Sequence, residues 1–334
     1  MSAGVATVSH DVEAGEVTVQ SARRAALDHV LRLIAEAPWS GGLVLRGSMT
    51  LPAWVGAAAR EPGDLDFVVL EPGEGSAVDR LAPFPYIDQV ADVQQWPEAA
   101  HAAAGAELWD PEGNFGTYGT RPRLPPEGLR WMDADDFGCE SPAVRLYEAV
   151  AADPHAGGGV VLDVDGIRED GTWTYRVHET PGIRLTLPYR TADGRAGGIQ
   201  LDFASDETLP QAPVWTAVPR GDGGPPTVAV TASPELSLAW KLLWLCSDGV
   251  ARAKDLYDAV LLAEAPRTRL GARLLRTVLG EHAGRFRPEV LESLPVDPDD
   301  LRAVRPSPRG GPDHWRGRLV SALGPLFAAG RRTA

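Results

Sequence analysis

Two aspartates at the start of an apolar run are the residues in this sequence best suited to chemistry. Asp64 and Asp66 flank Leu65 and lead into Phe67-Val68-Val69-Leu70. Because side chains alternate along a strand, both carboxylates would project from one face. Two carboxylates this close repel each other unless a cation lies between them, and hard oxygen ligands with room for water and phosphates suit Mg²⁺. The pair therefore predicts a Mg²⁺ site, and the competing interpretation is two solvated aspartates at a strand edge.

A third carboxylate lies inside another apolar run. Asp202 belongs to Ile199-Gln200-Leu201-Asp202-Phe203, where an aspartate is unfavourable for burial and for strand propensity. A neighbouring metal would relieve both costs, so Asp202 is predicted as a third ligand that could also take the proton of an attacking hydroxyl. Asp163 and Asp165 are the second choice, but they adjoin a turn, which favours a surface role.

Gly47-Ser48 joins a short strand pattern to a helix pattern. Glycine lets the backbone approach a ligand closely, and free N–H groups at the start of the following helix favour phosphate. A Gly-Ser turn before a helix is also a common cap. The pair is therefore a candidate nucleotide-binding turn. By itself it is a weak signal, and it gains significance only beside the other candidate residues.

Only two of the 32 basic residues are lysines, and both fall in one short segment. Lys241 lies on an apolar helix pattern between Trp240 and Leu242, so its ammonium must either extend to solvent or face an anion such as a nucleoside triphosphate. Lys254 precedes Asp255, which begins the next helix pattern and could be a simple first-turn charge.

The elements around these residues predict an α+β fold: a mixed sheet flanked by helices, with a C-terminal helical domain. A leader over 1–20 is expected to be disordered, a catalytic domain covers 21–230 with an irregular insertion over about 71–140, and the helical domain covers 231–330. Strands are predicted at 43–45, 64–70, 159–165, 172–178, 183–190 and 198–204, the last four antiparallel. Helices are predicted at 22–36, from Ser48 to about Ala59, and at 142–152, 234–247, 251–264, 267–280 and 313–328.

Charge is distributed unevenly along the 334 residues, whose formal net charge is −14. Residues 266–334 contain 13 arginines and 7 acidic residues, whereas the rest contains 19 basic and 39 acidic residues. The total argues against indiscriminate binding to nucleic acid or anionic membrane. The arginine-rich end is either a solvated helix surface or a contact surface for an RNA backbone. In the second interpretation the candidates are Arg302, Arg305, Arg309, Arg316 and Arg318.

The chain has no apolar run long enough to span a bilayer and does not begin like a secretory signal. Its two cysteines, Cys139 and Cys246, cannot build a disulfide framework or a cysteine-rich metal site. These features predict no membrane partner and a reducing, cytoplasmic location.

Taken in order, Gly47-Ser48, Asp64-x-Asp66, Asp202, Lys241 and Lys254-Asp255 resemble the AbiEii/AbiGii nucleotidyltransferase toxins of type IV toxin–antitoxin systems, which belong to the polymerase-β-like superfamily. The resemblance covers residues 40–265 and includes LVLRGSMTLPAW, IQLDFASDETLP and AWKLLWLCSDGVARAKDLYDAVLL. The last stretch is the most specific, because the superfamily at large lacks it.

The resemblance implies an enzyme that uses an NTP and Mg²⁺, a tRNA acceptor and a cognate antitoxin. It implies that Asp64 and Asp66 are metal ligands and that Lys241 contacts the nucleotide phosphates. It also implies that Asp255 is the acidic catalytic residue that the family carries late in its sequence. It also places Arg60 where relatives carry an arginine that contacts the triphosphate. Two alternatives stay open: a nucleotidyltransferase that modifies a small molecule, similar to the aminoglycoside enzymes, and a non-catalytic protein that binds nucleotide.

Overall fold

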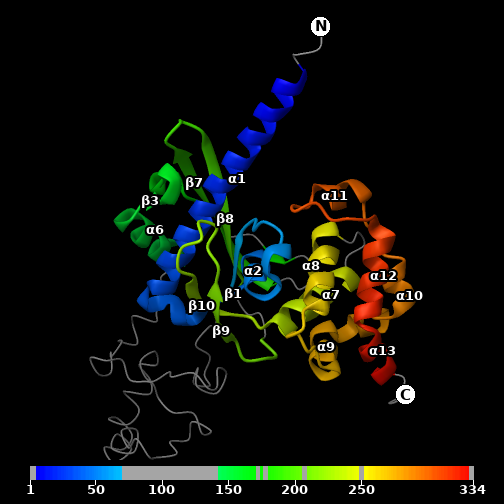
Figure 1. Ribbon diagram of the computed structural model, residues 1–334. Coiled ribbons are helices and arrows are strands. Elements are labelled where there is room, and N and C mark those ends of the chain that lie inside the picture. The colour runs from blue at the N-terminus through cyan, green and yellow to red at the C-terminus, as the bar shows by residue number, and fades with distance from the viewer. Residues whose placement is uncertain are drawn as a thin grey trace, which may run out of the picture. The chain divides into compact units, whose positions relative to one another are not determined.

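The computed structural model describes residues 5–69, 142–170, 174–175, 180–204, 209–247 and 252–330 (Figure 1). Met1–Val69 and Tyr147–Ala334 form one compact unit, which contains the fold discussed below. Leu70–Leu146 belong to another unit, and only 142–146 of it are described. The insertion predicted over 71–140 therefore lies outside the described residues. The predicted domain boundary near residue 230 stays a prediction.

Ten strands among the described residues form a mixed sheet in the order β3-β4-β7-β8-β2-β1-β10-β9, with β5 and β6 also paired to β7. The strands are β1 (Leu43–Arg46), β2 (Leu65–Val69), β3 (His155–Ala156), β4 (Val160–Leu162), β5 (Arg168–Asp170), β6 (Thr174–Tyr175), β7 (Thr180–Thr191), β8 (Ala196–Ala204), β9 (Val214–Val218) and β10 (Thr227–Thr231). The β2–β8 and β1–β10 pairs are parallel and the other pairs are antiparallel. The predicted α+β class is confirmed.

The centre of the sheet is apolar and buried because helices and loops cover both of its faces. All four residues of β1 are buried, and Phe67 of β2 stacks on Phe203 of β8 with ring centroids 5.4 Å apart. Strands buried in this way read as continuous hydrophobic runs, as Phe67-Val68-Val69 of β2 does, whereas β8 alternates apolar residues with Gln200 and Asp202. Strands β9 and β10 were not predicted, because they are short and lie among Pro- and Gly-rich turns.

Helix α1 (Val5–Glu36) packs against β8 and β10 through Leu27, Val30, Leu31 and Ile34, which recur at helical spacing and are buried. The predicted helix over 22–36 is therefore present, but it begins at Val5. The expectation of a disordered leader over 1–20 stays a prediction. A packed helix extends backward readily, since adding a residue to an existing helix avoids the cost of nucleation.

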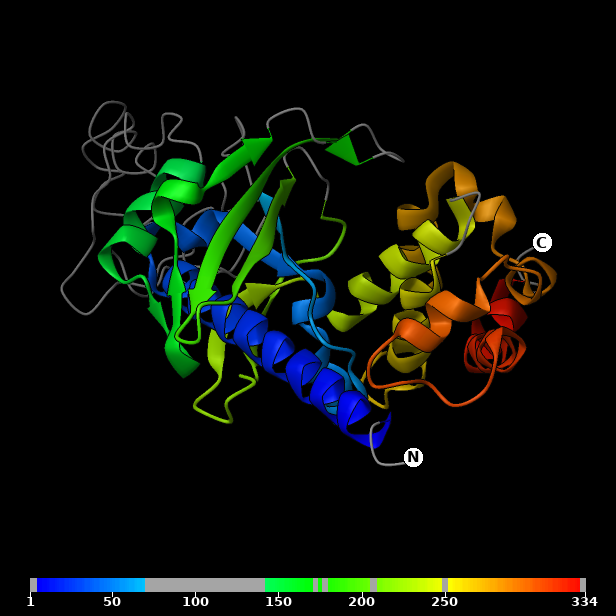
Figure 2. The same cartoon turned by 90° about the horizontal axis from the view of Figure 1, so that it is seen from above.

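The C-terminal helices group to one side of the sheet, and α2 (Leu51–Val55) contacts α8 from the sheet side (Figures 1 and 2). The helices in this half are α7 (Pro234–Ser247), α8 (Ala253–Glu264), α9 (Ala272–Leu279), α10 (Pro288–Glu292), α11 (Pro298–Ala303), α12 (Pro312–Ala322) and α13 (Gly324–Gly330); α6 (Pro142–Ala152) belongs to the region before β3. The predicted helix over 313–328 is divided between α12 and α13 at Leu323, ahead of Gly324-Pro325. Helix α7 is almost completely buried, which places Lys241 inside the molecule.

Candidate active site

Strand pairing brings two of the predicted carboxylates together. Asp66 of β2 lies directly opposite Asp202 of β8 in the parallel ladder. Residues in register on neighbouring strands project from the same face, so these side chains share one surface. Asp64 lies immediately before β2 and two residues from Asp66, which gives it the same side of the chain. The sheet therefore assembles Asp64, Asp66 and Asp202 from segments far apart in the sequence.

The Gly47-Ser48 turn packs against these carboxylates. Ser48 is buried; its hydroxyl donates to Asp64 Oδ1 at 3.2 Å and accepts from the Gly63 N–H at 3.2 Å. Gly47 has φ of +76°, and a Cβ built on it would overlap Asp66 Oδ2. Only glycine combines this conformation with so close an approach. The turn is thus shaped around the aspartate pair.

The helix after Ser48 is shorter than predicted. A 3₁₀ turn (Gly47–Met49) leads into α2, which ends at Val55 rather than near Ala59, and a second 3₁₀ turn follows at Gly56–Ala58. A helix this short adds little dipole. Recognition of phosphate at this turn would depend on close backbone approach and on the Ser48 hydroxyl.

Burial, together with the neighbouring Asp64 and Asp202, raises the pKa of the Asp66 carboxyl to about 8, while Arg46 and Lys241 oppose the shift. Arg46 lies opposite Asp66 on β1 and stacks over Trp240 of α7 with its guanidinium carbon 5.2 Å from the ring centroid. Without a cation the site therefore disfavours the charged form of Asp66, and an added cation would stabilise that form.

Asp202 already has protein partners. Arg184 of β7 donates to both of its oxygens at 2.8 and 2.9 Å, and Gln200 donates to Oδ2 at 2.9 Å. Across the described residues, no group of three or more His, Cys, Asp or Glu side chains is arranged to hold a metal ion. Asp64 and Asp66 therefore stand as a two-carboxylate pair, with Asp202 beside them and engaged by Arg184.

Asp163 and Asp165 lie away from this face. They fall between β4 and β5, on the far side of β7 from β8, and Asp163 donates its N–H to Pro188 O near the other end of β7. The structure therefore removes them as alternatives to Asp202.

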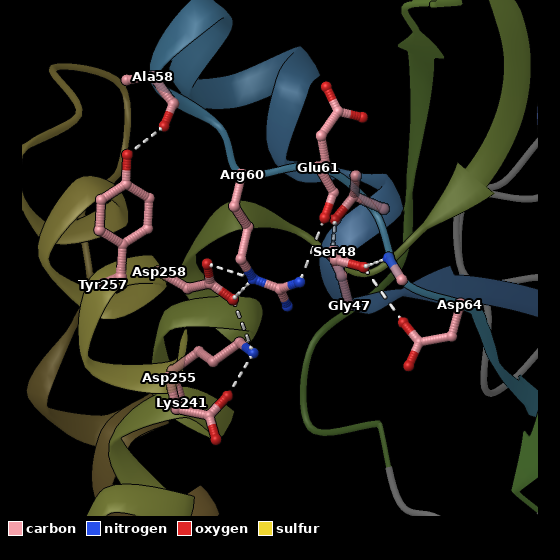
Figure 3. A network of polar contacts seen from close by, with 12 residues as sticks. Gly47, Ser48, Ala58, Arg60, Glu61, Asp64, Lys241, Asp255, Tyr257 and Asp258 are labelled. Atoms are coloured by element: carbon pink, nitrogen blue, oxygen red, sulfur yellow. Dashed lines mark hydrogen bonds and ion pairs between the residues drawn. The ribbon is translucent and has the colours of Figure 1, made fainter. Parts of the chain in front are cut away.

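Lys241 is 5% exposed and is enclosed by two carboxylates of α8 (Figure 3). Its Nζ lies 2.7 Å from Asp255 Oδ1 and 3.0 Å from Asp258 Oδ2, and 4.8 Å from the Trp244 ring centroid. Burial alone would lower the pKa of Lys241, but Asp255 and Asp258 outweigh burial and the net shift is upward. The anion that an apolar setting demands is thus supplied by the protein. The predicted contact of Lys241 with nucleotide phosphates stays a prediction.

The pairing with Lys241 also explains why Asp255 is buried and charged. Burial favours its neutral form, but Lys241 outweighs burial, so its pKa is lowered and the group stays charged. Asp255 is in the first turn of α8, yet its side chain points inward to Lys241. It is therefore a buried partner of Lys241 and more than a first-turn charge.

Arg60 connects this buried cluster to the carboxylate strand. Its Nε donates to both oxygens of Asp258 at 3.0 and 3.1 Å, and Figure 3 shows it between α8 and the Gly47-Ser48 turn. Burial opposes its charge, but Asp258 raises the pKa of Arg60 overall. Tyr257 adds a hydrogen bond of 2.8 Å to Ala58 O. Helix α8 is therefore anchored to the segment that leads into Asp64.

A family model for the nucleotidyl transferase AbiEii toxins of type IV toxin–antitoxin systems matches residues 136–326. The chain belongs to this family. The AbiEii match spans Asp202, Lys241 and Asp255, but it begins after Gly47, Ser48, Arg60, Asp64 and Asp66. The sheet register and the Arg60–Asp258 contact are what join the two sets in one AbiEii nucleotidyltransferase.

A solved structure has a similar fold: MenT4, a nucleotidyltransferase toxin from Mycobacterium tuberculosis H37Rv. The two chains share 16% identity with a TM-score of 0.50, and the alignment covers 91% of this chain and 82% of MenT4. No curated protein sequence matches this AbiEii chain. No described helix is both long enough and apolar enough to cross a bilayer.

Sequence reasoning missed two side chains that pair with the predicted site residues of this AbiEii protein, Asp258 and Arg184. Asp258 follows Asp255 by three residues, and that spacing on a helix places both on one face, so it could have been found. Arg184 gave no such signal, because its partner Asp202 is supplied by the neighbouring strand and not by a local pattern.

Proposed function

We propose that this AbiEii nucleotidyltransferase transfers NMP from an NTP to a hydroxyl of tRNA in a Mg²⁺-dependent reaction. The observation that supports it most is the alignment of Asp66 with Asp202, with Gly47 fitted against Asp66 and Ser48 bonded to Asp64. Carboxylates beside a small-residue turn are what metal-assisted phosphoryl transfer requires.

The residues present fit a magnesium ion. Asp64 and Asp66 would hold it, because Mg²⁺ is commonly bound by one or two carboxylates together with waters and substrate phosphates. The raised pKa of Asp66 reflects its burial and the neighbouring Asp64 and Asp202, so a cation bound there would favour the charged carboxylate. When bound, the ion would neutralise charge on the phosphates and orient them. Asp202 would join the ligand set only if it exchanged or shared the two hydrogen bonds from Arg184.

The remaining roles follow from position. The Gly47-Ser48 backbone would cradle the terminal phosphates, because Gly47 lets this turn lie directly against the Asp66 carboxylate. Arg60 and Lys241 would offset charge on the leaving pyrophosphate, Lys241 from within its Asp255–Asp258 cluster. Asp202 is the candidate acceptor for the proton of the attacking hydroxyl.

The partners proposed for the chain are an NTP, a tRNA acceptor and a cognate antitoxin, in the cytoplasm. The family's place in toxin–antitoxin systems supports the antitoxin. The arginine-rich C-terminal region supports an RNA acceptor over a cationic small molecule, which the acidic remainder of the chain would favour.

Labelling experiments test the proposal. The protein is incubated with each α-labelled NTP, Mg²⁺ and either total tRNA or an aminoglycoside. We expect label on tRNA, and we expect Asp64→Ala and Asp66→Ala each to lower the rate at least about a hundredfold while the melting temperature is retained. Asp163→Ala is the matched control and should keep the rate.

Full activity in either Asp64→Ala or Asp66→Ala would sink the metal-site assignment. Label on the aminoglycoside alone would replace tRNA by a small-molecule acceptor. Absence of label on every acceptor, with NTP still bound, would point to the non-catalytic alternative.

A further inference from the structure

A cavity of about 440 Å³ lies beside the carboxylate pair, on the other side of the segment 60–63. Gly63 and Arg60 line it, whereas Gly47, Ser48, Asp64 and Asp66 do not. Gly63 donates its N–H to Ser48, which in turn bonds Asp64, so the cavity and the carboxylates are neighbours separated by one stretch of chain. A volume of this size is in the range of small-ligand sites.

The cavity wall is basic, although the chain as a whole is acidic. Its basic residues are Arg23, Arg60, Arg252, Lys254 and Arg305, and its acidic residues are Glu61 and Asp300. Three of the cations have partners within the protein: Arg60 bonds Asp258, Arg23 bonds Gly63 O, and Arg305 bonds Val304 O.

Arg252 and Lys254 are different. Neither side chain makes a hydrogen bond or ion pair within the described part of the chain. Arg252 is exposed and Lys254 is half-buried, and they flank the start of α8, next to the Asp255 that holds Lys241. Two cations that make no ion pair with any described residue, gathered at one concavity of a protein with charge −14, indicate an anionic ligand.

We propose that this cavity binds a backbone phosphate of the acceptor nucleic acid, with Arg252 and Lys254 as its principal contacts. The proposal rests on the proposed transfer to tRNA. When the acceptor hydroxyl lies at Asp64 and Asp66, the adjoining phosphate of the same strand would lie in this neighbouring cavity. The triphosphate of the NTP would instead lie with the carboxylates and the Gly47-Ser48 turn.

A binding experiment with the full-length protein tests the cavity. The double variant Arg252→Gln/Lys254→Gln is compared with Arg273→Gln/Arg276→Gln, which removes the same charge from two exposed positions of α9.

Affinity for fluorescent tRNA is measured in EDTA across a salt series, and affinity for NTP is measured with Mg²⁺. We expect the cavity variant to bind tRNA about tenfold more weakly, with a log–log salt slope lower by about one unit, and to keep its NTP affinity. The α9 variant should match wild type in both.

Unchanged tRNA affinity in the cavity variant would overturn the proposal. A loss of NTP affinity in place of tRNA affinity would also overturn it and would assign the cavity to the triphosphate. Label transfer by wild type is recorded in parallel. If wild type labels tRNA but the cavity variant binds tRNA normally, only the cavity assignment fails; if wild type labels nothing and the cavity variant still loses tRNA affinity, only the proposed reaction fails.

Discussion

The contact between Gly47 and Asp66 shows how one residue type can determine a site. The backbone of Gly47 has a positive φ and lies against the carboxylate of Asp66, so the turn and the strand fit together only without a side chain. The same contact holds the carboxylate close to Asp64, whose partner is Ser48.

Replacing Gly47 with alanine is therefore expected to abolish transfer, because the new Cβ displaces the Asp66 carboxylate. The positive φ adds strain of about 1–3 kcal/mol to the folded state. Gly194→Ala is the control: Gly194 also has a positive φ, of +84°, but no atom would lie within 4 Å of its Cβ. Rates and unfolding free energies of both variants are measured, and equal rates would contradict the role assigned to Gly47.

Asp66 should also give the metal-free protein a characteristic pH dependence. Its pKa rises from 3.8 to about 8 on folding, so the folded state retains a proton that the unfolded state has lost between these values. This contribution to stability is fully present below pH 3.8 and is lost as pH rises toward about 8. Chemical denaturation in EDTA from pH 6 to 9 should show the free energy of unfolding of wild type falling toward pH 8 and then levelling.

Asp66→Asn should remove that part of the pH dependence, since the amide does not titrate. A variant whose stability falls with pH as steeply as that of wild type would refute the shifted pKa of Asp66.

At the scale of elements, helices α7 and α8 are joined through charge as well as apolar packing. Lys241 of α7 lies between Asp255 and Asp258 of α8, and Arg60 approaches Asp258 from the sheet side. The cluster is buried, so its charges depend on one another and not on water.

Lys241→Met is accordingly expected to destabilise the protein by about 3–5 kcal/mol, because it leaves two carboxylates with too little positive charge in a buried place. Lys254→Met, at the other lysine of the chain, should change the free energy of unfolding by no more than about 0.5 kcal/mol. Denaturant titrations compare the two, and equal stability would mean that Lys241 is dispensable to the packing of α7 on α8.

Across the whole molecule, the structure divides the five C-terminal arginines proposed for RNA contact. Arg302 pairs with Asp299, Arg316 with Asp313, and Arg318 with both oxygens of Glu264. Arg305 lines the basic cavity, and Arg309 is exposed. The arginines already engaged with acids have less charge to offer a polyanion.

If tRNA is the acceptor, Arg305→Gln/Arg309→Gln should lower the log–log salt slope of tRNA binding by at least about one unit. Arg316→Gln/Arg318→Gln should leave the slope unchanged and cost no more than about 1 kcal/mol of stability, since these ion pairs are partly exposed. The readout is tRNA affinity over a salt series. Identical slopes for the two variants would mean that an ion pair with an acidic residue does not keep an arginine from contacting tRNA.

Local patterns in the sequence determined much of this protein. The apolar strands around Asp66 and Asp202 and the ends of α7 follow from periodicity and turn residues, which act over a few neighbours, and the predicted range 234–247 coincides with α7 (Pro234–Ser247). The α+β class follows from the order of such segments. The roles of Asp64, Asp66 and Lys241 in transfer stay predictions.

Only the tertiary structure decided how these segments meet. The register that sets Asp66 opposite Asp202, the pairing of Lys241 with Asp258 and the basic cavity beside Gly63 each join residues far apart along the chain. A charge in the sequence has no partner until the chain folds. Packing therefore decides whether the Lys241 ammonium pairs with a ligand or with a protein carboxylate. Burial removes the water that would otherwise solvate the charge, so the charge needs a partner.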